Sequence, residues 1–140
     1  MRLRPAMIGL LVALALALAL ALGLPTLGGE AAVRIERPAV RFTLDEYTVS
    51  PQRVSVRPGR IKLVVRNRGE LFHNLRVETV PDELQERGEL LGGTRSAQPS
   101  EQVTAKLQLK PGTYRILCTM ANHEALGMYG TLVVEGEPLR

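Results

Sequence analysis

The amino-acid sequence predicts an all-β fold, a β-sandwich of about seven to eight strands. Apolar residues recur at every second position over residues 60–66 and 103–109, and this period of two is typical of strands with one buried face. Turn signals that contain glycine, at residues 58–59, 67–69 and 111–112, separate the strands at intervals typical of a sandwich. The roughly 110 residues that follow an apolar N-terminal segment are enough for one small domain.

Residues 1–24 form that separate segment. Arg2 and Arg4 precede an uncharged run of mostly Ala and Leu, which is the pattern of a secretory signal. The run also approaches the ~20 residues that a helix needs to cross a bilayer. We therefore expect a hydrophobic helix that is either a signal peptide or an N-terminal membrane anchor, with the rest of the chain exported. Residues 25–38 are expected to be a linker, and residues 39–140 the folded domain.

Within the domain, seven segments have the composition and the alternation of strands. They are residues 40–44, 52–56, 60–66, 73–78, 103–109, 113–118 and 131–135. Between the fourth and fifth segments, residues 82–87 are expected to form a short helix, followed by a mobile loop at Gly92-Gly93. In the fourth segment, His73 shares its inward face with Leu75 and Val77.

Four side chains with metal-binding atoms stand out. Cys118, His123 and Met128 lie in one segment after a predicted strand, and His73 lies upstream. Two imidazoles, a thiolate and a thioether are the ligands of a mononuclear copper electron-transfer site. Each residue alone is more often part of a core. However, the chain contains one cysteine and two histidines in total, and such a site would use all three.

The two segments that carry these residues resemble the signature of the cupredoxins, the small blue copper proteins related to plastocyanin, azurin and auracyanin. One is Pro111-Gly-Thr-Tyr-Arg-Ile-Leu-Cys118, continued by His123 and by Gly127-Met128-Tyr-Gly-Thr-Leu-Val-Val134; the other is Asn67-Arg-Gly-Glu-Leu-Phe-His73-Asn74. The resemblance covers roughly residues 40 to 135. It implies a Greek-key sandwich with one type 1 copper ion.

By the same resemblance, His73, Cys118 and His123 would be the strong equatorial ligands, and Met128 the long axial ligand. The sequence departs from many relatives at one place, since Ala121-Asn122 stands where they carry Pro-Gly before the second histidine. This departure leaves the shape of the ligand loop open.

Two groups of residues are expected to support the site. The amide of Asn74 is expected to bond to the backbone or hydroxyl of Thr119 and so tie the His73 segment to the Cys118 loop. An apolar collar around His123, the ligand expected nearest to solvent, would suit brief docking of redox partners. The collar residues are Leu71, Phe72, Met120, Ala121 and Leu126.

These features predict an exported blue copper protein that shuttles single electrons between redox partners of a respiratory or photosynthetic chain. We expect a monomer in the periplasm or on the outer face of the cytoplasmic membrane, with membrane contact only through the N-terminal segment. A periplasmic copper chaperone or storage protein is the alternative, although such sites usually contain more methionines. No enzyme activity is expected, because no paired carboxylates or nucleophile–base pair accompany the closed ligand set. The net charge of +4 comes without a long basic block, so a nucleic-acid partner is not expected.

Overall fold

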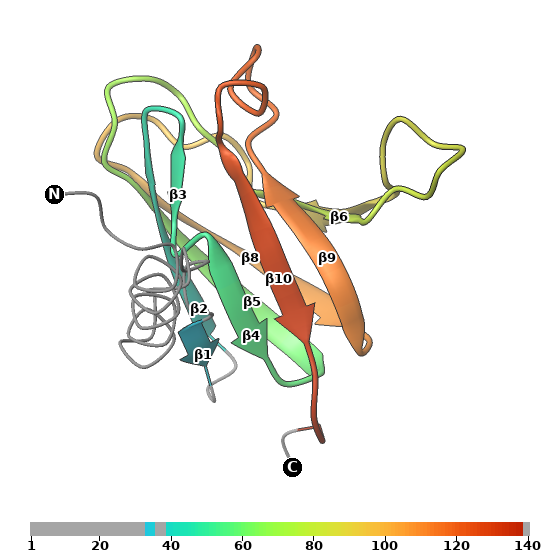
Figure 1. Cartoon of the computed structure of the whole chain (residues 1–140). Helices are drawn as coiled ribbons and strands as arrows, with labels where there is room; N and C mark the ends of the chain where they lie inside the picture. The colour runs from blue at the N-terminus through green and yellow to red at the C-terminus, as the bar shows by residue number, and fades with distance from the viewer. Residues whose placement is uncertain (1–32, 36–38, 139–140) are drawn as a thin grey trace, which may run out of the picture.

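Ten strands in two sheets make up the computed structural model, which describes residues 33–35 and 39–138 (Figure 1). The strands are β1 (Val33–Ile35), β2 (Ala39–Asp45), β3 (Thr48–Ser50), β4 (Arg53–Val56), β5 (Gly59–Asn67), β6 (Arg76–Thr79), β7 (Leu90–Gly93), β8 (Gln102–Leu109), β9 (Gly112–Leu117) and β10 (Tyr129–Val134). One sheet has the order β1-β4-β10-β9-β6-β7, and the other has the order β3-β2-β5-β8. The predicted all-β sandwich is therefore confirmed.

Both sheets are mixed. In the six-stranded sheet, β4 pairs in parallel with β1 and β10, while β9 pairs antiparallel with β10 and β6. In the four-stranded sheet, β5 pairs in parallel with β2 and antiparallel with β8. The β2–β3 turn, the β5–β6 connection and the β9–β10 connection meet at one end of the sandwich, as Figure 1 shows.

Alternating apolar side chains fill the space between the sheets. Buried and more exposed side chains alternate almost regularly along β2 and β5, and the buried Phe42 and Leu63 are exposed by no more than 2%. Ile116 of β9 and Leu132 of β10 are fully buried in the same core. Burying such side chains contributes roughly 1.5–3 kcal/mol each, so the core holds the connections at the end of the sandwich in place.

The structure contains three short strands that the sequence pattern did not predict, namely β1, β3 and β7. Each has only three or four residues, which is too short for an alternating pattern to be recognised. β1 lies within the predicted linker; the rest of that linker, and the predicted hydrophobic helix at residues 1–24, lie outside the described residues. Among the described residues, no helix is long and apolar enough to cross a membrane.

Two local predictions were wrong. Residues 82–87 form turns and bends instead of a helix, because Pro81 and Gly88 leave too few residues between them to nucleate one. Gly92 and Gly93 end strand β7 rather than forming a loop. A side chain on Gly93 would meet the backbone of Leu75 at 2.2 Å, so glycine permits the close pairing of β7 with β6.

Candidate metal centre

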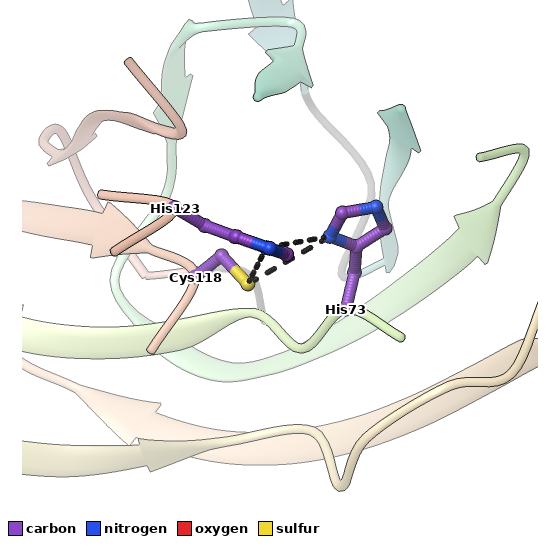
Figure 2. A group of neighbouring side chains, drawn as sticks. All are labelled: His73, Cys118 and His123. Carbon is purple, nitrogen blue, oxygen red and sulfur yellow. Dashed lines mark hydrogen bonds between the residues drawn. The ribbon is translucent and has the colours of Figure 1, made fainter. Parts of the chain in front are cut away.

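Three buried side chains converge at the end of the sandwich that carries the β9–β10 connection. The Nδ1 atoms of His73 and His123 lie 3.2 Å apart, and the Sγ atom of Cys118 lies 3.9 Å and 3.6 Å from them, respectively. Figure 2 shows the three side chains pointing toward one another. Among the described residues, this is the only cluster of three or more His, Cys, Asp or Glu side chains that could hold a metal ion.

The triangle formed by these atoms has the size that one metal ion requires. A point equidistant from the three atoms lies about 2.1 Å from each, within the ~2.0–2.3 Å range of metal–nitrogen and metal–sulfur bonds. Two imidazoles with one thiolate favour copper or zinc over the hard cations. The residues present therefore fit a single transition-metal ion.

Backbone hydrogen bonds close the β9–β10 connection. The Cys118 N–H donates to the Met128 carbonyl at 3.0 Å, and the Met128 N–H donates to the His123 carbonyl at 3.0 Å. A third bond runs from the His123 N–H to the Met120 carbonyl at 2.9 Å. These bonds fix the backbone of Cys118, His123 and Met128 relative to one another.

His73 enters from the β5–β6 connection. It was predicted to open a strand, but β6 begins only at Arg76, and His73 instead pairs with Ala97 through two backbone bonds. The buried Asn67 side chain holds this connection, since its amide donates to the Leu71 carbonyl at 2.7 Å and to the Ala97 carbonyl at 3.0 Å. Leu75 is fully buried, as expected for the inward face.

Burial distinguishes the four predicted ligands. His73, Cys118 and Met128 are fully buried, while His123 keeps 6% of its surface exposed. The prediction that His123 lies nearest to solvent is therefore confirmed. Met128 lies within the hydrogen-bonded loop, and its role as an axial ligand stays a prediction. The sulfur of Met120 accepts weak hydrogen bonds from Ser96 and Asn74, which favours an outer position for that residue.

Asn74 joins the two halves of the site, as predicted. Its amide nitrogen donates to the Thr119 hydroxyl at 2.9 Å, and its amide oxygen accepts from the Thr119 N–H at 2.9 Å. These bonds connect the residue after His73 with the residue after Cys118. Such outer contacts set the orientation of metal ligands.

Sequence reasoning missed Glu46, which lies in the turn between β2 and β3. Its Oε1 atom is 3.4 Å from Nε2 of His73 and also accepts the N–H groups of Glu70 at 2.7 Å and Leu71 at 3.0 Å. The hydrogen bond from the Leu71 backbone, with those from Glu70 and His73, lowers the pKa of Glu46 to about 2, although desolvation opposes the shift. An ionised Glu46 accepts a hydrogen bond from the Nε2–H group of His73, and this tautomer leaves the Nδ1 lone pair for a metal ion.

The approach of Glu46 depends on Gly69. A Cβ atom on residue 69 would lie 2.2 Å from Oε1 of Glu46. Gly69 and His73 lie in the β5–β6 connection, but Glu46 lies 27 residues before His73, and no local motif connects it with them. A long-range contact of this kind leaves no signal in one sequence.

Tyr47 follows Glu46 and packs against the second histidine. The Tyr47 and His123 rings make an edge-to-face contact with centroids 5.3 Å apart.

Burial lowers the pKa of His123, the neighbouring His73 lowers it further, and Glu46 acts in the opposite direction. The imidazole is therefore kept neutral, which is the form that binds metal ions.

The ligand loop departs from ordinary backbone geometry at Ala121, whose φ is 42°. This left-handed conformation lies at the position where the sequence lacks the Pro-Gly of many cupredoxins. Next to His123, the carboxylate of Glu124 pairs with Arg87 and Arg115, so the loop is also held from the side of β9. These contacts define the loop shape that the sequence left open.

Three of the five predicted collar residues are exposed large hydrophobic side chains. Leu71, Phe72 and Leu126 keep 43%, 51% and 50% of their surface exposed, respectively. Ala121 is exposed and Met120 is half-buried. The end of the sandwich that holds the metal cluster therefore presents apolar surface to solvent.

Comparisons with known proteins agree with this fold. The solved structures that resemble the chain include a reduced auracyanin from the photosynthetic bacterium Roseiflexus castenholzii, with a TM-score of 0.64 and 19% identity over 73% of this chain and 100% of that chain. They also include auracyanin A, a "blue" copper protein from Chloroflexus aurantiacus, with a TM-score of 0.60 and 16% identity over 73% and 99% of the two chains. Rusticyanin from Thiobacillus ferrooxidans has a TM-score of 0.56 and 16% identity over 79% and 85%.

At these identities the structural matches establish the fold. No curated protein sequence matches the chain significantly. The cupredoxin-like domain family matches residues 10–134, nearly the whole chain. Cupredoxins bind one copper ion, and His73, Cys118 and His123 are positioned to hold a metal. The chain therefore belongs to the cupredoxin-like domain family.

Proposed function

We propose that this protein is an exported carrier of single electrons that holds one type 1 copper ion. The observation that carries the proposal is the buried triangle of Cys118 Sγ with the Nδ1 atoms of His73 and His123. We propose Met128 as the axial fourth ligand, because its backbone is bonded to both Cys118 and His123.

Bound copper would supply one-electron redox chemistry. The residues of the chain contribute a rigid and water-poor environment for it. Asn74 and the backbone bonds of the ligand loop restrain His73 and Cys118, and a restrained site suits electron transfer because little rearrangement accompanies a change of charge. Glu46 orients His73 through its outer nitrogen.

His123 is the proposed point of electron exchange, since it is the most exposed of the four ligands. The exposed Leu71, Phe72 and Leu126 would contact redox proteins of a respiratory or photosynthetic chain during brief encounters. The N-terminal run of residues 1–24 supports export to the periplasm or the outer face of the cytoplasmic membrane.

Electron transfer is favoured over catalysis by the burial of the site. His73 and Cys118 are inaccessible, and His123 has only 6% of its surface exposed, so a substrate would have little access to the metal. Metal-dependent enzymes keep a coordination position open for substrate or water.

The test is to load the full chain, in detergent, with Cu(II) and to record visible absorption and EPR spectra. We expect an intense thiolate-to-copper absorption that bleaches on reduction and returns on oxidation, and that is absent in the C118S variant. Cu(II) binding without this absorption, or with absorption that C118S retains, would refute the proposal. Retention of Cu(I) together with rapid loss of copper on oxidation would instead favour a chaperone or storage role.

A further inference from the structure

The outer face of the four-stranded sheet carries a group of basic side chains at alternate positions. Those on β5 have the opposite parity to the buried Ile61, Leu63 and Val65, so they point away from the core. The exposed basic residues of this face are Arg41 on β2, Arg60, Lys62 and Arg66 on β5, and Lys106 on β8. We refer to them as the basic face.

The strand register places like charges side by side. Lys62 is directly opposite Lys106 across the β5–β8 pair. Like charges in directly opposed positions destabilise a sheet. Val64 lies between Lys62 and Arg66 on the same strand and is 6% exposed, with Arg41 and Thr104 as its cross-strand neighbours. The face is thus a continuous positive surface over three strands.

Among the described residues, no ion pair neutralises the basic face. The ion pairs of the described residues involve Arg87, Arg95, Arg115 and His73, and none includes a residue of the basic face. The acidic side chain that shares this face is Asp45, at the last position of β2. By contrast, the guanidinium groups of Arg87 and Arg115 pair with glutamates beside the six-stranded sheet.

The basic face also lacks the apolar centre of a protein interface. Within the part of the chain that the structure describes, the large exposed hydrophobic side chains lie outside strands β2, β5 and β8. Protein–protein interfaces usually bury aromatic or aliphatic side chains at their centre. A flat positive surface without such side chains instead suits a layer of phosphate groups, which long basic side chains contact through charge.

We propose that the basic face rests on an anionic phospholipid surface. β5 runs along this face and ends at Asn67, where the connection to His73 begins. With the sheet flat on the lipid, the metal centre therefore points along the membrane plane and stays accessible to partners in the same membrane. This contact comes in addition to the N-terminal segment, which we expected from the sequence to be the only membrane contact.

The length of the chain before β1 is compatible with this arrangement. Residues 25–32 separate the predicted anchor from β1 and span at most about 29 Å when fully extended. An anchor at residues 1–24 would thus keep the basic face within reach of the headgroups, where each Lys or Arg adds to the attraction.

Lysine acylation offers a direct test, because the three lysines of the chain lie on this face or next to it. Lys62 and Lys106 belong to it, and Lys110 follows β8 directly. The full chain would be reconstituted into nanodiscs of phosphatidylcholine, alone or with about one-third phosphatidylglycerol, and the acylation rate of each lysine measured by mass spectrometry. We expect Lys62 and Lys106 to react several-fold more slowly on the anionic discs, and this protection to disappear in high salt.

Charge variants test whether the basic face makes the contact with lipid, and they keep Lys62 and Lys106 for the acylation measurement. The R41Q/R66Q double variant should lose the protection, since two fewer charges lower the affinity on the order of tenfold or more. The R53Q/R57Q double variant has the same net charge but leaves the basic face intact, and it should keep the protection. Equal rates on both kinds of disc, or equal losses in both variants, would overturn the proposal. Protection by soluble poly-glutamate, with none from phosphatidylglycerol, would also overturn it and would point to an acidic protein.

Discussion

Asn74 and Thr119 are bonded in both directions, through the amide nitrogen to the hydroxyl and through the amide oxygen to the backbone N–H, each at 2.9 Å. The two residues are 45 positions apart in the chain, and each follows a metal-binding residue, His73 or Cys118. Together with the pairing of β6 and β9, this contact sets the distance between the two halves of the site.

The N74A variant should therefore hold copper less tightly. Loss of an outer hydrogen bond to a metal site typically lowers affinity about 10–100-fold. Competition with a chelator would measure the change, and EPR would report any distortion. N122A is the matched control, because the exposed Asn122 lies in the β9–β10 connection together with Thr119. Equal affinities for N74A and wild type would rule out a restraining role for Asn74.

The E46Q variant should have a higher reduction potential than the wild type. Its amide keeps the size of the carboxylate but removes a negative charge next to His73, and that charge favours Cu(II) over Cu(I). Direct electrochemistry would measure the shift. E70Q, which removes an exposed carboxylate nearby, should change the potential less. If the two variants shift equally, the contact between Glu46 and His73 has no specific effect.

The A121G variant should be more stable than the wild type. Ala121 has a φ of 42°, and a residue with a Cβ atom in this region is strained by roughly 1 kcal/mol relative to glycine. Denaturant unfolding should show a gain of about 0.5–1 kcal/mol. A105G, in the middle of β8, should lose about the same amount. A loss of stability in both variants would mean that the ligand loop is not strained at this position.

Stability should depend on Glu101 at acidic pH. The hydrogen bond from Arg95, with that from the Gln98 backbone, lowers the pKa of Glu101 from 4.5 to about 2. A lowered pKa in the folded state means that the ionised side chain stabilises the fold above pH 4.5, and that this contribution is lost as the pH falls through about 2. The E101Q variant should show a flatter acid dependence over this window than the wild type. E83Q serves as the control, and identical curves for E101Q and wild type would contradict the prediction.

The L126K variant should exchange electrons more slowly with its spectrum unchanged. A charged side chain in the half-exposed collar disturbs apolar contact near His123 without touching the ligands. Electron self-exchange between copies of the protein, followed by NMR, needs no identified partner. L84K adds the same charge at a fully exposed position between β6 and β7, so it controls for net repulsion. Equal slowing in both variants would leave the collar without a role.

The sequence predicted the long strands and the three residues of the metal cluster because both leave local signals. Alternation in β5 and β8 reports which face is buried, and the rarity of cysteine and histidine makes Cys118 and His73 conspicuous. Glu46 could not be found in this way. Glu46 lies in a turn that folding places next to His73. Nothing in the sequence distinguishes this glutamate from the others.

The errors have similar physical causes. β7 was missed because it is short and ends in two glycines, which signal a loop when read alone. Gly93 fits against the backbone of Leu75 and Gly92 against the side chain of Leu107, and both neighbours are close in space but not in sequence. The helix predicted at residues 82–87 rested on local propensity, which a segment of that length cannot sustain without tertiary contacts.

The bond between Asn74 and Thr119 also determines when in folding the site can be completed. β9, the ligand loop and β10 form a hairpin whose contacts are close in sequence, and hairpins form early. His73 can join only after a loop of some 45 residues has closed, a slower event because the chain loses entropy before any contact compensates. A newly made chain thus passes through a stage with Cys118, His123 and Met128 assembled and one imidazole missing, and during that stage its thiol is most open to oxidation or to the wrong metal.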